Sequence, residues 1–163
     1  MSCQEIFKFN NKHIIQSIGT IKNASRGSYI LWEYLSQKYL GKPFNMFNLN
    51  NQEFWDLFYD SRLSLDERIV LGSTYDFALV KKEDLSQLIK AQKKVFAEMK
   101  IEYPTSALKE EYELLESIMN DDFYAIGWHR NSVSCDMWDE YDLSNSNEHW
   151  FLFDEIQEKI GEL

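Results

Sequence analysis

The sequence predicts an α+β fold, a mostly helical single domain with a small β-sheet over residues 1–163. Its 163 residues are 44% hydrophobic and 15% aromatic, enough for one buried core, and glycine (6) and proline (2) are scarce. Several windows place apolar residues at helical spacing behind good N-cap residues. A few short segments instead alternate or are continuously apolar, which is typical of strands.

The first forty residues mix strand, loop and helix signals. Ser28 is well placed to cap a helix, and Gly41 followed by Pro43 is a typical helix end. In chain order we expect a strand over Glu5–Phe9, one or two helical turns over His13–Ile18, a polar loop over Gly19–Gly27 and a helix over Tyr29–Leu40.

The middle of the chain carries the clearest helix signals. Ser64 with Glu67 three residues later forms the pattern of a capping box. Further on, apolar residues from Leu85 to Met99 fall on one face, with lysines away from it. Helices are therefore expected over Gln52–Tyr59, Leu65–Leu71, Glu83–Met99 and Ala107–Met119.

The remaining segments complete the expected sheet and the C-terminal end. Phe123–His129 is the best strand candidate, and the short apolar run Phe77–Val80 favours a strand only weakly. Asn131–Ser146 reads as irregular. A terminal helix is expected over Glu148–Ile160, where large apolar residues recur at helical spacing.

Composition also indicates where the protein works. No run of eighteen apolar residues suggests a membrane span, and the N-terminal residues do not read as a secretory signal. Cys3 and Cys135 are too few for a disulfide framework and lack metal-ligand spacing. We therefore expect two reduced thiols in a cytoplasmic protein.

Charge is divided unevenly along the chain. Residues 1–100 hold 14 bases and 11 acids, a net charge of +3, whereas residues 101–163 hold 3 bases and 16 acids, a net charge of −13. Binding to nucleic acid needs clustered Lys and Arg, so such a partner is not expected. An acidic surface favours a cationic protein partner, although acids that only maintain solubility would leave the same pattern.

Motifs for catalysis are weak. Cys135 and His129 could form a nucleophilic pair, but the acids around Cys135 would raise the thiol pKa, whereas a nucleophile needs it lowered. The acids between Asp136 and Asp142 lack the spacing and the glycine of an EF-hand, so no metal or cofactor is expected. The sequence thus predicts a binding protein rather than an enzyme.

Three segments resemble a family of bacterial immunity proteins encoded beside polymorphic toxins, including those of contact-dependent growth inhibition. They are SLDERIVLGSTYDFALVKKEDLSQLI (Ser64–Ile89), YAIGWHRNSVS (Tyr124–Ser134) and HWFLFDE (His149–Glu155). The resemblance implies a cytoplasmic protein that binds one cognate toxin domain and blocks it. Many such toxins are nucleases with basic active-site clefts, which an acidic surface would suit.

The predicted toxin-binding residues combine carboxylates with interface-forming aromatics. They are Asp136, Trp138, Asp139, Glu140, Tyr141, Asp142 and His129. For His129 the alternative is a hydrogen-bonded histidine at a strand end. Two other functions remain open: a small hydrolase using paired carboxylates, and an acidic mimic of nucleic acid that blocks a DNA-binding protein.

Overall fold

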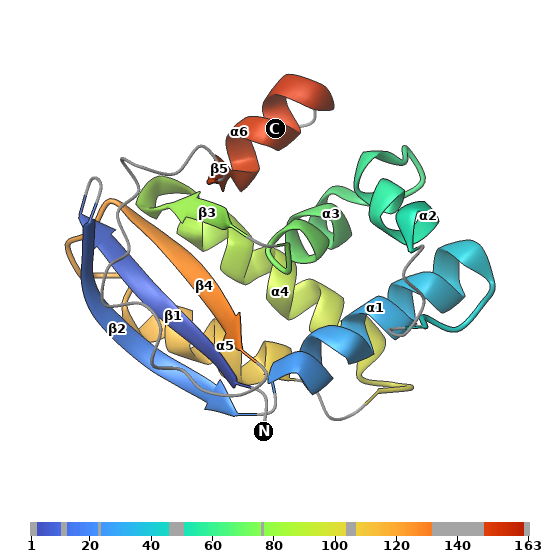
Figure 1. Ribbon diagram of the computed structural model, residues 1–163, viewed down its shortest axis with the longest axis horizontal. Coiled ribbons are helices and arrows are strands. Elements are labelled where there is room, and N and C mark those ends of the chain that lie inside the picture. Colours follow the sequence, from blue (N-terminus) through green and yellow to red (C-terminus); the bar gives the residue numbers. More distant parts are fainter. Residues whose placement is uncertain are drawn as a thin grey trace.

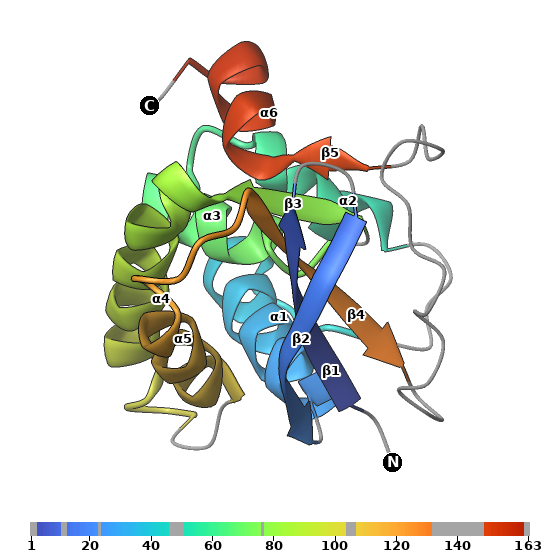
Figure 2. The ribbon, with the colours of Figure 1, turned by 90° about the vertical axis from the view of Figure 1, so that its left-hand side faces the viewer.

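A computed structural model describes residues 3–10, 13–22, 24–45, 51–75, 77–103, 107–131 and 149–161. It shows helices gathered on one side of a five-stranded sheet whose strand order is β2-β1-β4-β3-β5 (Figure 1). Turned by 90°, the molecule presents the sheet in front, with α1 behind it and α4 and α5 beside it at the left (Figure 2). The predicted α+β class, mostly helical with a small sheet, is confirmed.

The sheet is mixed. Its strands are β1 (Cys3–Asn10), β2 (His13–Lys22), β3 (Ala78–Lys81), β4 (Ala125–Asn131) and β5 (Trp150–Phe151). Only the β3–β5 pair is parallel, and the other neighbours are antiparallel. β1 pairs with all of β4, whereas β3 pairs only with its first part, so the second half of β4 extends past the beginning of β3.

The helices follow the predicted order. They are α1 (Ala24–Leu40), α2 (Gln52–Trp55), the 3-10 turn η1 (Asp56–Tyr59), α3 (Leu65–Gly72), the 3-10 turn η2 (Lys82–Asp84), α4 (Leu85–Met99), α5 (Ala107–Ser117) and α6 (Leu152–Lys159). The capping box is confirmed, since Ser64 Oγ accepts from the Glu67 N–H while the Glu67 carboxylate accepts from the Ser64 N–H. Gly41 follows α1 with φ +65°, the left-handed conformation expected at a helix end.

The prediction for the N-terminal segment was wrong. His13–Ile18 is not helical and Gly19–Gly27 is not a loop: β2 pairs with β1 as far as Lys22, and α1 begins at Ala24. Ser28 therefore lies inside the helix and is not its cap. The isoleucines of this segment suit either period, and pairing with β1 decides in favour of the strand.

The terminal helix begins later than predicted. Trp150 and Phe151 form β5, and α6 begins only at Leu152. The Trp150 N–H donates to the Phe77 carbonyl oxygen at 3.2 Å, next to the parallel pairing of Ala78 with Trp150. Backbone hydrogen bonds to β3 thus hold Trp150 and Phe151 in the sheet, although they lie in a segment with the apolar spacing of a helix.

Buried apolar side chains occupy both faces of the sheet. Ile6 and Ile126 belong to the main core with the helices. Phe7, Phe9 and Leu79 form a second, smaller cluster, because alternate residues of a strand point to opposite faces. The outer face of the sheet is therefore apolar as well.

Candidate functional site

Six of the seven predicted toxin-binding residues lie outside the described residues. They are Asp136, Trp138, Asp139, Glu140, Tyr141 and Asp142. The backbone of His129 lies in β4, paired with Glu5 of β1, and its side chain also falls outside the description. The structure does describe the two points at which the part of the chain that contains the other six residues joins the sheet.

Both attachment points lie at one end of the sheet. The described chain stops at Asn131, the end of β4, and resumes at His149, just before β5. Because β4 runs antiparallel to β3 and β5 runs parallel to it, the end of β4 and the beginning of β5 both lie toward the beginning of β3. This is the right-hand side of the sheet in Figure 2. We call residues 132–148 the acidic segment, because they include five carboxylates and no Lys or Arg.

Phe77 and His149 lie where the acidic segment rejoins the sheet. Their rings make an edge-to-face contact with centroids 5.2 Å apart. With Phe9 and Trp128 from the strands, they help to line a cavity of about 10 Å³, which is far too small for a substrate. Burial lowers the pKa of His149, because it disfavours the charged form of the imidazole.

Elsewhere, ion pairs join the basic half of the sequence to the acidic half. Lys8 Nζ lies 2.7 Å from Asp121 Oδ2, and Lys81 Nζ lies 2.7 Å from Asp154 Oδ1. Lys93 pairs with Glu116 in the same way. In each pair a base from residues 1–100 meets an acid from residues 101–163. These ion pairs partly neutralise the net charge of −13 that residues 101–163 carry. The acidic segment, by contrast, contains no base of its own.

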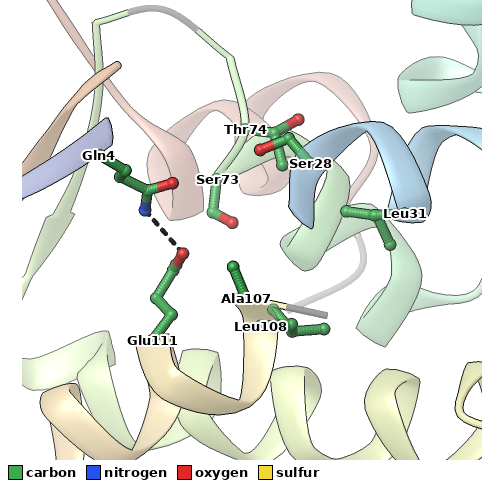
Figure 3. A pocket seen from close by; sticks show the side chains of 8 residues that line it. All are labelled: Gln4, Ser28, Leu31, Ser73, Thr74, Ala107, Leu108 and Glu111. Carbon is green, nitrogen blue, oxygen red and sulfur yellow. Dashed lines mark hydrogen bonds between the residues drawn. The ribbon is translucent and has the colours of Figure 1, made fainter. Parts of the chain in front are cut away.

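A small cavity of about 20 Å³ lies between β1, α1, the end of α3 and the start of α5 (Figure 3). Buried Glu111 borders it and accepts from Gln4 Nε2 at 2.7 Å, Gln92 Nε2 at 2.7 Å and Trp128 Nε1 at 3.1 Å. A space of this size holds about one water molecule. We therefore read Glu111 as a polar joint between α5, α4 and two strands, in which the carboxylate satisfies three buried donors.

Glu67 forms a second buried carboxylate centre, between α1 and α3. It accepts from Lys38 Nζ at 2.7 Å, Tyr39 OH at 2.6 Å and Ser64 Oγ at 2.6 Å. Burial alone would raise the pKa of Glu67, but these hydrogen bonds outweigh it and lower that pKa. Burial and the bond to Glu67 raise the pKa of Tyr39 to about 12. The cluster ties the end of α1 to the beginning of α3.

The sequence contains a signal for the burial of Glu111 but none for the conformation of Phe77. Glu111 lies three residues after Leu108 and four before Leu115, on the apolar face of α5, so the sequence marks it as a buried carboxylate that needs partners. The conformation of Phe77, which has φ +61°, has no such signal, because that position carries neither glycine nor asparagine.

Comparison with known proteins gives no relative: no protein-family model, no curated protein and no solved structure matches the chain. Across the described ranges, no helix combines the length and the apolar character needed to cross a membrane. The same part of the chain shows no group of three or more His, Cys, Asp or Glu side chains arranged to hold a metal ion.

Proposed function

We propose that this protein is a cytoplasmic immunity protein that binds a cognate bacterial toxin domain and neutralises it. The toxin is a basic protein, a nuclease being the best fit, and the inhibitor covers its active site. The observation that carries the proposal is the acidic segment, which has five carboxylates, no base, and both ends attached at one end of the sheet. The resemblance of three segments to immunity proteins supports the same function.

Occlusion follows from the chemistry of the acidic segment. Asp136, Asp139, Glu140 and Asp142 face the Lys and Arg side chains with which a nuclease holds its phosphate substrate. Complementary charge speeds the encounter and selects the partner. Trp138 and Tyr141 supply the desolvated centre of the interface, since Trp and Tyr give a large contact area for little lost rotamer entropy. His129, in the adjoining strand, adds a polar contact.

Charge reversal tests this surface. The double variant Asp139→Lys/Glu140→Lys should associate with the product of the gene directly upstream at least about tenfold more slowly than the wild type. Stopped-flow measurements at low and high salt give the rates, and the advantage of the wild type should shrink as ionic strength screens the charges. In cells, the variant should protect less well against the same toxin.

The matched control reverses two acids on another element. Glu110 and Glu113 are exposed on α5, so Glu110→Lys/Glu113→Lys makes the same change in net charge away from the acidic segment. It should leave the association rate within about twofold of the wild type if local charge dominates. Equal slowing by both double variants would show that only net charge matters, and no slowing by Asp139→Lys/Glu140→Lys would exclude this surface.

A further inference from the structure

The small cavity beside Glu111 is lined in part by polar side chains that are themselves buried. Gln4 of β1 is 2% exposed, Ser28 of α1 is 7% exposed, and Ser73, just after α3, is 1% exposed. A polar group removed from bulk water needs a hydrogen-bond partner, because burying it without one is unfavourable. The partners of these side chains therefore decide what the cavity holds.

Side chains and main chain meet part of this need. Gln4 Nε2 donates to the Glu111 carboxylate at 2.7 Å, and Ser73 Oγ donates to the Val70 carbonyl oxygen at 2.8 Å. Thr74 Oγ1, which also borders the cavity, both donates a hydrogen bond and accepts one. The hydrogens of the Ser73 and Thr74 hydroxyl groups are thus committed to the main chain.

Two polar atoms at the cavity remain, the Gln4 carboxamide oxygen and the Ser28 hydroxyl. Among the described residues, neither Gln4 Oε1 nor Ser28 Oγ has a hydrogen-bond partner. Figure 3 shows the oxygen of the Gln4 carboxamide turned away from Glu111, toward the space beside Ser73. The carboxamide oxygen accepts hydrogen bonds, and the hydroxyl can donate one. The cavity, at about 20 Å³, exceeds the roughly 10–15 Å³ that one water molecule needs.

We infer that this cavity binds one ordered water molecule, which accepts from Ser28 Oγ and donates to Gln4 Oε1. A bridging water is enthalpically nearly as favourable as a direct hydrogen bond. The water extends the Glu111 joint, which holds α5, α4 and two strands, to a fifth element, α1. This role in holding the helices to the sheet is independent of the proposed function.

High-resolution crystallography of the wild type tests the site directly. A water molecule should lie about 2.6–3.2 Å from both Ser28 Oγ and Gln4 Oε1. In Ser28→Val, two methyl groups occupy the cavity and no hydroxyl remains, so this water should be absent. The number of long-lived internal waters, measured by ¹⁷O relaxation dispersion of water, should fall by one in the same variant.

A double-mutant cycle tests the bridge in solution. No direct hydrogen bond joins Ser28 to Gln4, so the water is what couples their effects on stability. Ser28→Ala should raise the unfolding equilibrium constant about fivefold in the wild-type background, and less than about twofold in the Gln4→Ala background. Ser117→Ala is the matched control, because Ser117 is exposed and bonds to the Leu114 carbonyl oxygen within α5. Its effect should be the same in both backgrounds.

Three results would overturn the inference. The first is a wild-type crystal structure in which the cavity is dry, or in which Ser28 Oγ donates to the Ala24 carbonyl oxygen four residues earlier in α1. The second is an anomalous peak at this site in crystals grown with rubidium chloride, which would identify a monovalent cation. The third is an equal effect of Ser28→Ala in both backgrounds. If a variant fails to fold, the wild-type crystal structure still decides.

Discussion

The Glu67 centre offers the sharpest test of the packing between α1 and α3. Replacing Glu67 by Gln keeps the size of the side chain and removes one acceptor oxygen and the charge. In the structure, Oε1 accepts from Lys38, while Oε2 accepts from Tyr39, from Ser64 Oγ and from Ser64 N. An amide has one oxygen, so it satisfies the three donors at Oε2 only by turning its NH₂ group toward Lys38.

The cost follows from these contacts. Three hydrogen bonds to a carboxylate become bonds to a neutral amide, and each loses about 0.5–1 kcal/mol. The Lys38 side chain is 39% exposed, so water screens that pair and its loss adds at most about 1 kcal/mol. Glu67→Gln should therefore lower the free energy of unfolding by about 2–4 kcal/mol at neutral pH.

The effect should depend on pH in a defined direction. The folded protein lowers the pKa of Glu67 below the ordinary value of 4.5, so its stabilisation is complete above that value. It is lost as the pH falls through the lowered pKa, where the folded carboxylate takes up a proton. Gln cannot titrate, so the difference between wild type and variant should be constant near neutral pH and shrink below about pH 4.5.

Urea unfolding, followed by tryptophan fluorescence at several pH values, measures both effects. Glu98→Gln is the matched control, because Glu98 lies 3.8 Å from the same Lys38 but is itself exposed, and its replacement should cost less than about 0.5 kcal/mol. A loss below about 1 kcal/mol for Glu67→Gln at pH 7, or a loss that does not change with pH, would refute this account.

Two further substitutions test contacts that join distant parts of the chain. A Cβ added at Gly72 would lie 2.4 Å from Leu152 Cδ1 and 2.7 Å from Phe58 Cε2, so Gly72→Ala should destabilise the protein by about 1–3 kcal/mol in thermal unfolding. No loss would mean that α6 shifts freely against α3. Glu111→Gln turns an NH₂ group toward one of three buried donors and should cost about 2 kcal/mol in urea unfolding. An unchanged NMR shift of the Trp128 indole N–H would argue against this hydrogen-bonded network.

Local signals were enough for most of the helices and for two strands, since the predicted strand Glu5–Phe9 lies within β1. The Ser64 capping box, the amphipathic stretch of α4 and the glycine after α1 each depend on neighbouring residues, and the structure has all three. The strand Phe123–His129 was found within two residues at each end. These predictions hold because caps and helical faces are decided within a few residues.

The geometry of the candidate site could not be predicted from local signals alone. Composition located the acidic segment, but only the strand order shows that β4 and β5 bring its two ends to the same end of the sheet. Composition also suggested an acidic C-terminal half, whereas Lys8 and Lys81 cross the fold to neutralise Asp121 and Asp154. Ion pairs over such sequence distances have no local pattern.

Taken by itself, the sequence determined the fold class, most helices, and where acids and large rings concentrate, because these depend on composition and short-range spacing. Tertiary structure decided that His13–Lys22 is a strand, that Trp150 belongs to β5 and not to the terminal helix, and that Phe77 takes a positive φ. The physical reason is the same in each case. Backbone hydrogen bonds to a distant strand, or packing against a distant ring, outweigh the small free-energy differences that local preference supplies.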